Sequence, residues 1–153
     1  MKDLFEKFLQ LMHQFELQNI DYILIGGMAV NLQGFARNTD DIDVFIKLEE
    51  LNIDNLRTAM FNVFNDNEIN EITYEELEKF SVIRYGAQDG FYIDIISRIG
   101  EEFSFNHLNY EEKEIDGVKI KVADVKTLYK LKEHTYREID QLDLKFLKSK
   151  LEN

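Results

Sequence analysis

The segment DIDVFI, residues 41–46, constrains the fold more than any other part of this 153-residue chain. Side chains alternate between the two faces of a β-strand, so Asp41 and Asp43 project from one face while the aliphatic residues between and after them cover the other. Two adjacent carboxylates are unfavourable unless water, a cation or a basic group compensates their charge. We therefore predict a strand anchored by its apolar face that presents both acids to Mg²⁺, which prefers oxygen ligands.

A pair of glycines precedes this segment at the end of another apolar strand. Residues 22–25, YILI, are typical of a short buried strand, and Gly26 and Gly27 follow where a helical pattern begins. Glycines at such a turn let a ligand approach the backbone, and the first amides of a helix bind phosphate. Arg37 and Thr39 lie between this helix and the acids. Arg37 is a candidate phosphate contact, and Thr39 either caps a turn or bonds a phosphate oxygen.

The spacing of these residues resembles a family signature. Ile25 followed by Gly26 and Gly27, then thirteen residues, then Asp41-Ile42-Asp43-Val44, is similar to the pattern of the nucleotidyltransferase superfamily related to DNA polymerase beta. That family needs a third acid on a later strand, and Asp94 in FYIDII matches it. The resemblance covers residues 20–96 well and the C-terminal part only in outline.

Within the superfamily, the chain looks most like the small bacterial nucleotidyltransferases of abortive-infection and toxin–antitoxin systems. The series that carries this likeness is Arg37, Thr39, Asp41 and Asp43, and the chain length also resembles the lincosamide nucleotidyltransferases. The resemblance implies an α/β fold with a small mixed sheet flanked by helices. It also implies transfer of a nucleoside monophosphate from an NTP to an acceptor hydroxyl, with release of pyrophosphate.

The resemblance assigns roles to particular residues. Asp41, Asp43 and Asp94 would be the catalytic residues and the ligands of two Mg²⁺ ions, with Mn²⁺ as an alternative metal. The nucleotide would contact five residues: Gly26, Gly27, Arg37, Thr39 and Lys130. Lys132 and Arg84 are further candidates for the triphosphate or the acceptor, although a solvated helix face explains the lysines equally well.

The acceptor stays open at this stage. It could be tRNA, a hydroxyl of a partner protein or a small antibiotic, and a partner protein or a homodimer is compatible with the sequence. A non-catalytic module with this fold, acting as a toxin–antitoxin partner, is the alternative function, and a metal-dependent phosphohydrolase is a third. The base of the NTP is also undetermined.

Charge and composition narrow these choices. The net charge of −12 argues against broad adhesion to nucleic acid, whose binding depends on Lys and Arg. Residues 1–110 hold 8 basic and 20 acidic residues, whereas residues 111–153 hold 10 of each, so RNA would favour the C-terminal segment. The absence of Cys and of a long apolar run predicts a cytoplasmic protein with no membrane contact.

The rest of the chain predicts one domain, residues 1–153, with its core at about 20–96 and a C-terminal hairpin and helices at about 110–150. Helices are expected at 3–18, 48–64, 122–133 and 137–150. A hairpin is expected from strands 80–85 and 91–96 joined at 86–90, with a polar loop at 65–71. A second hairpin is expected at 111–122, with Asp116 and Gly117 as its two-residue turn.

Overall fold

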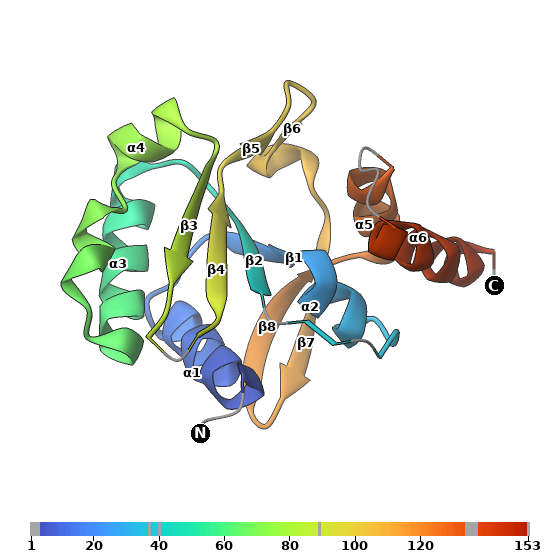
Figure 1. The fold of residues 1–153 in the computed structure, drawn as a ribbon, viewed down its shortest axis with the longest axis horizontal. Helices are drawn as coiled ribbons and strands as arrows, with labels where there is room; N and C mark the ends of the chain where they lie inside the picture. Colours follow the sequence, from blue (N-terminus) through green and yellow to red (C-terminus); the bar gives the residue numbers. More distant parts are fainter. Residues whose placement is uncertain (1–3, 37, 40, 89, 134–137, 153) are drawn as a thin grey trace.

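The computed structural model describes residues 4–36, 38–39, 41–88, 90–133 and 138–152, and it is an α/β structure built on one large mixed sheet (Figure 1). The strand order in this sheet is β3-β4-β2-β1-β8-β7. The strands are β1 (Tyr22–Ile25), β2 (Asp41–Ile46), β3 (Val82–Gly86), β4 (Tyr92–Ile96), β7 (Tyr110–Ile115) and β8 (Val118–Ala123). The predicted fold class is confirmed.

The sheet contains both antiparallel and parallel pairs. β2 is antiparallel to β1 and parallel to β4, whereas β3 is antiparallel to β4. β8 joins the other side of β1 in parallel and forms a hairpin with β7. The strands that carry the predicted acids, β2 and β4, are therefore direct neighbours in the middle of the sheet.

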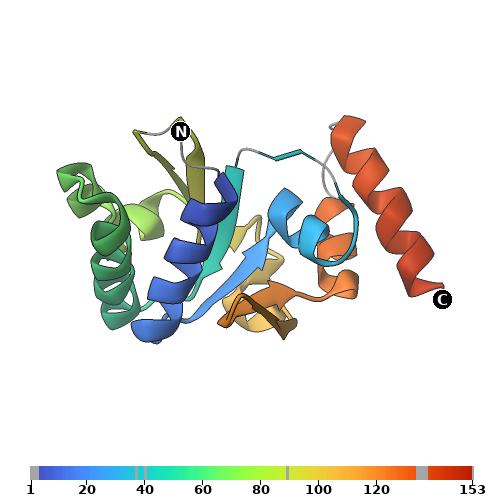
Figure 2. The same cartoon turned by 90° about the horizontal axis from the view of Figure 1, so that it is seen from below.

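Helices cover the sheet in two groups (Figures 1 and 2). α1 (Leu4–Leu17) packs against α3 (Glu50–Phe64) and β8, and it buries Phe8, Leu11, Met12 and Phe15. α2 (Gly26–Leu32) contacts β1, β2 and β8, and α5 (Val125–Lys132) packs on α2 and on α6 (Glu138–Leu151). No helix in the described part of the chain is both long and apolar enough to cross a membrane.

Both predicted hairpins are present. β3 and β4 pair as expected, and the connection between β7 and β8 is the two-residue turn at Asp116 and Gly117. Both of these residues have positive φ, 51° and 81°, which is the backbone that a tight hairpin turn of this kind requires.

Several element boundaries differ from the sequence prediction. α5 begins at Val125 rather than at 122, because β8 continues to Ala123 and the Asp124 carboxylate accepts a hydrogen bond of 2.8 Å from the Thr127 amide. The predicted polar loop contains a 3₁₀ helix, η1 (Asn67–Glu71), whereas α4 (Tyr74–Lys79) lies where the sequence predicts a short acidic helical turn or loop, at 74–78. A small two-stranded sheet, β5 (Arg98–Ile99) with β6 (Phe103–Ser104), and the 3₁₀ helix η2 (Phe105–His107) were not predicted.

Candidate active site

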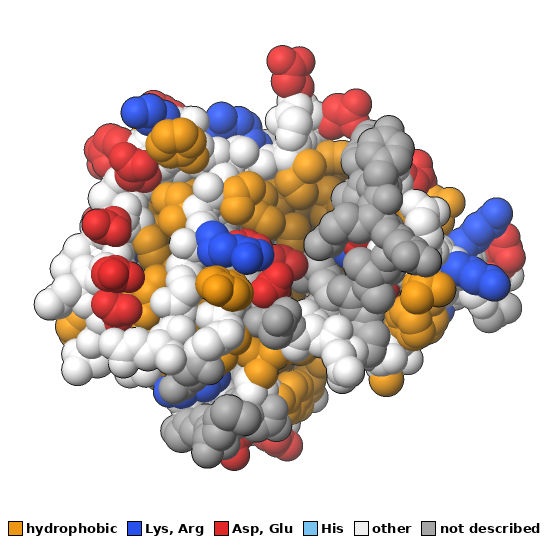
Figure 3. Space-filling view, viewed as in Figure 1, with side chains coloured by type: hydrophobic (Ala, Val, Ile, Leu, Met, Phe, Trp, Pro, Cys, Tyr) orange, Lys and Arg blue, Asp and Glu red, His pale blue; other side chains and the backbone are white. Residues whose placement is uncertain are grey.

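Strand pairing brings the three predicted acids to one face of the sheet. In the parallel pair of β2 and β4, Asp43 lies opposite Asp94 and Asp41 lies opposite Tyr92. Directly opposed residues of neighbouring strands point to the same face. We call Asp41, Asp43 and Asp94 the carboxylate site. Figure 3 shows acidic and basic side chains gathered in the middle of this face, with hydrophobic side chains around them.

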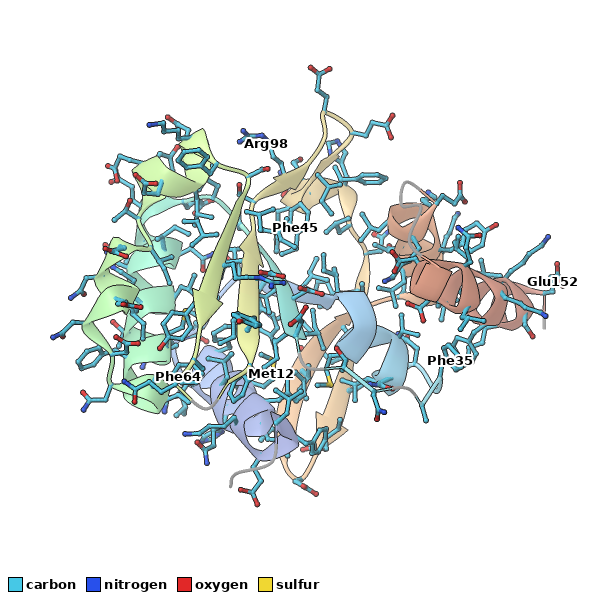
Figure 4. All side chains as sticks on the ribbon, viewed as in Figure 1. Met12, Phe35, Phe45, Phe64, Arg98 and Glu152 are labelled. Atoms are coloured by element: carbon cyan, nitrogen blue, oxygen red, sulfur yellow. The ribbon has the colours of Figure 1, made fainter. Side chains whose placement is uncertain are left out.

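The same face changes character along β2. Phe45, two residues beyond Asp43, is fully buried, whereas Asp43 is only partly buried and the side chain of Asp41 is 32% exposed (Figure 4). The acids therefore occupy the open end of a strand whose other end belongs to the hydrophobic core. This anchoring holds the carboxylates in place, because the apolar residues around them fix the strand.

The glycine turn lies directly against the carboxylate of Asp43. Gly26 follows β1 with a φ of +73°, and β1 is the antiparallel neighbour of β2. A Cβ atom on Gly26 would lie 2.0 Å from Oδ2 of Asp43, which is a severe clash. Both the backbone conformation and the contact therefore require glycine at this position. The bare backbone at the start of α2 and the carboxylate site form one continuous surface.

Arg84 of the neighbouring strand β3 binds two of the three acids. It lies opposite Asp94, and its Nε and Nη2 donate to the two carboxylate oxygens of Asp94 at 2.9 and 3.0 Å. Nη2 also donates to Oδ2 of Asp41 at 3.3 Å, and the guanidinium stacks on the ring of Tyr92 at 4.6 Å. The hydrogen bond and charge of Asp94 raise the pKa of Arg84 further above its usual value.

Asp43 holds its proton unusually tightly. Burial raises its pKa to about 7, and the charge of Asp94, a side-chain hydrogen bond with Asp94 and the charge of Asp41 act in the same direction. The positive charge of Lys132 opposes these effects. Asp43 is therefore the acid of this site with the least positive charge beside it, because the guanidinium of Arg84 bonds Asp41 and Asp94.

This excess of negative charge fits a divalent cation. Three carboxylates from adjacent strands supply the oxygen ligands that Mg²⁺ prefers, and neutralising them would remove their mutual repulsion. In the part of the chain that the structure describes, no group of three or more His, Cys, Asp or Glu side chains is already arranged to hold a metal ion. In this arrangement the guanidinium of Arg84 bonds Asp41 and Asp94 at the same time.

The predicted nucleotide contacts fall at different places. Gly27 is buried behind Gly26, and the hydroxyl of Thr39 bonds the backbone carbonyl and amide of Asp41 at 3.2 and 3.4 Å. Thr39 therefore shapes the entry to β2. Arg37 lies outside the described residues. Lys130 is exposed on α5, and the lysine of this helix whose charge reaches Asp43 is Lys132.

Lys132 belongs to a buried ion cluster between the last two helices. Its Nζ lies 2.7 Å from Oδ1 of Asp140 and 3.1 Å from Oδ2 of Asp143, and the three side chains are 8%, 0% and 0% exposed. We call these three residues the helix-pair cluster. Phe35, which follows α2 and is labelled in Figure 4, stacks on Phe146 of α6 with ring centroids 5.0 Å apart, and this adds a second attachment for α6.

The ion pairs of Arg84 and Lys132 were not predicted from the sequence. A turn at 86–90 aligns Arg84 with Tyr92, whereas β3 extends to Gly86 and aligns Arg84 with Asp94. A register shift of two residues was therefore enough to hide the pair. Asp140, Asp143 and Leu147 are spaced so that they share one face of α6. Two acids on an otherwise apolar helix face were the sequence signal that could have indicated a buried basic partner.

Comparisons with known structures identify the fold. The chain superposes with the lincosamide antibiotic adenylyltransferase LnuA, solved with lincomycin, at a TM-score of 0.55 and 19% identity, covering 94% of this chain and 96% of that one. It also matches ANT(2")-Ia, solved with adenylyl-2"-tobramycin, at a TM-score of 0.56 and 12% identity, covering 96% and 90%. No protein-family model matches the sequence, and no curated protein matches it significantly.

A third similar structure is an antigenic nucleotidyltransferase-like protein from Paracoccidioides brasiliensis. It gives a TM-score of 0.57 and 17% identity over 92% of this chain and 74% of that one. The chain therefore has a nucleotidyltransferase fold, which confirms the resemblance noted in the sequence.

Proposed function

We propose that this protein is a metal-dependent nucleotidyltransferase that moves a nucleoside monophosphate from an NTP to an acceptor hydroxyl. The observation that carries the proposal is the meeting of Gly26, Asp43 and Asp94. The register of β2 and β4 places the two acids side by side, and the glycine turn touches the carboxylate of Asp43. A metal–triphosphate needs both carboxylates for the metal and open backbone for the phosphates.

Each residue has a role in this reaction. Asp41, Asp43 and Asp94 would hold Mg²⁺, which, when bound, neutralises the triphosphate and makes the α-phosphorus easier to attack. The backbone of Gly26, at the start of α2, would face the phosphates. Asp94 accepts the proton of the acceptor hydroxyl as a general base. The acceptor oxygen bonds to the α-phosphorus, the bond from that phosphorus to the bridging oxygen breaks, and pyrophosphate leaves.

A small molecule with a free hydroxyl is the best-supported acceptor. The structure of LnuA contains lincomycin, and that of ANT(2")-Ia contains adenylylated tobramycin. The acidic surplus of residues 1–110 also suits a cationic small molecule better than tRNA. A protein hydroxyl and tRNA are therefore alternatives that the assay must include.

Labelled nucleotides test the proposal directly. The protein is incubated with Mg²⁺ and each NTP carrying label at either the α- or the γ-phosphate, together with hydroxyl-bearing antibiotics, bulk tRNA or a bacterial protein extract. We expect α-label on an acceptor, γ-label in pyrophosphate, and loss of both with Asp43→Asn. NTP hydrolysis without acceptor labelling would indicate a phosphohydrolase.

The binding-module alternative makes a different prediction. If neither label moves with any nucleotide, and the Asp41→Asn/Asp43→Asn double variant keeps the biological effect of the wild type on growth, the protein acts by binding alone. That result would contradict the proposed activity.

A further inference from the structure

We propose that Arg84 is a built-in counter-cation that a free divalent ion must displace, so that the carboxylate site accepts its metal together with the nucleotide rather than as the free ion. This inference rests on the proposed function and concerns the order in which that site is filled. It is carried by the position of one guanidinium relative to the three acids.

The guanidinium bonds carboxylate oxygens that a metal would also use. Its Nε and Nη2 engage both oxygens of Asp94, and Nη2 also reaches Asp41. Mg²⁺ demands near-ideal octahedral geometry around a small ion, so it tolerates little competition for its oxygen ligands. Arg84 is half exposed, whereas Asp94 is only 15% exposed, so the guanidinium shields part of Asp94 from solvent.

The surroundings stabilise the guanidinium in this place. The ring of Tyr92 lies 4.6 Å from its central carbon and provides a stacking surface. The fork geometry of arginine matches a carboxylate with two parallel hydrogen bonds, which a lysine at this position could not reproduce. The contacts of Arg84 thus fix the orientation of Asp94 and reduce the negative charge of the site before any ligand arrives.

Displacement is easier when a triphosphate enters with the metal. A free divalent ion brings only positive charge toward Arg84 and leaves the released guanidinium without an anion. A metal–nucleotide complex brings phosphate oxygens, which accept the same two-point contact that Asp94 gave up. The site is therefore expected to bind free metal weakly and metal–nucleotide much more tightly.

Binding of Mn²⁺ to metal-free protein tests the inference without any turnover. Free Mn²⁺ is counted by electron paramagnetic resonance in titrations of the wild type and of Arg84→Gln, in the absence of nucleotide. We expect Arg84→Gln to bind Mn²⁺ about fivefold to tenfold more tightly, because the ion then displaces no ion pair and approaches no like charge.

Two matched variants serve as controls. Arg84→Lys keeps the charge but loses the fork, so we expect an affinity between those of the wild type and Arg84→Gln. Arg98→Gln removes an exposed arginine whose Nη1 donates to the backbone carbonyl of Glu78, away from the acids, and its Mn²⁺ affinity should equal that of the wild type. With a non-hydrolysable NTP present, the difference between wild type and Arg84→Gln should shrink to less than about twofold.

The possible outcomes separate this inference from the proposed function. Equal, measurable Mn²⁺ affinities for the wild type and Arg84→Gln would overturn the counter-cation and leave nucleotidyl transfer standing. The same holds if neither protein binds free Mn²⁺ while label transfer with Mg²⁺ proceeds. Absence of both Mn²⁺ binding and label transfer would overturn the proposed function, and the inference with it.

Discussion

Two clusters of this molecule contain the same kinds of side chain and yet are built for opposite purposes. Among the residues that the structure describes, the carboxylate site has three acids and one arginine, and the helix-pair cluster has two acids and one lysine. In the first, Arg84 is half exposed and Asp41 is about one third exposed; in the second, Asp140 and Asp143 are fully buried. Both clusters are acid-rich, so solvent access is the feature that distinguishes them.

The difference in solvent exposure predicts a different role for each cluster. A buried charge that loses its partner is strongly unfavourable, so the helix-pair cluster holds α5 and α6 together and tolerates little change. An exposed pair contributes little to folding and exchanges its partner readily, so the carboxylate site can replace Arg84 by a ligand. The exposure of these two clusters, rather than their composition, therefore indicates which one is structural and which one can bind a ligand.

The largest expected effect on folding is at Lys132. Lys132→Met removes the ammonium group that bonds the buried carboxylates of Asp140 and Asp143, which should lower the free energy of unfolding by about 3–5 kcal/mol. Urea denaturation followed by circular dichroism measures this. Lys132→Met combined with Asp140→Leu and Asp143→Leu removes all three charges and should recover most of the loss. If the single variant lowered the free energy of unfolding by less than about 1 kcal/mol, the cluster would not be what holds α5 and α6 together.

The corresponding change in the carboxylate site should affect activity and not folding. Asp43→Asn removes a carboxylate that repels Asp41 and Asp94, so the fold should be at least as stable as the wild type. Label transfer should fall by about 10²–10³-fold, the range found when a single group that stabilises charge in a transition state is removed. Retention of more than a tenth of the wild-type rate would contradict the assignment of Asp43.

Replacing Gly26 should affect both folding stability and activity. Gly26→Ala places a methyl group against Oδ2 of Asp43 on a backbone with φ of +73°, so stability should fall by about 1–3 kcal/mol. Activity should fall as well, because Asp43 must move. Gly117→Ala serves as the control for backbone conformation alone. Gly117 has a φ of +81°, but a Cβ atom added there would meet no atom within 4 Å. If both variants lose the same stability and activity, the contact with Asp43 carries no weight.

The pH dependence of stability provides a smaller and more specific effect. The pKa of Asp43 is about 7 in the folded protein and 3.8 in an ordinary environment, so the folded state binds the proton more tightly. The stabilisation is fully present below about pH 4 and is lost as pH rises through 7. In EDTA, the stability of the wild type relative to Asp43→Asn should therefore fall between pH 5 and pH 8. A difference independent of pH would contradict the raised pKa.

The smallest expected effect is that of Arg84→Gln on folding. Its ion pairs are partly exposed, so the free energy of unfolding should change far less than with Lys132→Met. The same urea titration measures this alongside Lys132→Met. A loss as large as that of Lys132→Met would remove the distinction between the two clusters.

The sequence predicted the parts of this structure that depend on local pattern. The alternation in DIDVFI placed Asp41 and Asp43 on one face, and Asp116 with Gly117 marked a hairpin turn that the structure contains. Long-range pairing was beyond the pattern. The opposition of Asp43 and Asp94 depends on a parallel register between strands whose first residues, Asp41 and Tyr92, are 51 positions apart, and only the resemblance to a family connected the two acids.

The register of β3 and the burial of Lys132 were even harder to predict from the sequence. The contact of Arg84 with Asp94 depends on where β3 ends, and a two-residue error in the turn removes it. Lys132 and Lys130 lie on the same short helix with the same residue type, yet one is buried and the other is exposed. Lys132 bonds Asp140 and Asp143 of α6, and this long-range contact cannot be predicted from the pattern of α5.

Anomalous diffraction from crystals grown with Mn²⁺ and a non-hydrolysable NTP is the most direct measurement of the central claim. We expect a manganese peak within coordination distance of Asp41, Asp43 and the triphosphate, with the phosphates against Gly26 and with Arg84 moved away from Asp94. A manganese peak elsewhere on the protein, or a triphosphate bound away from the glycine turn, would contradict the claim that β1, β2 and β4 build a nucleotide-transfer site.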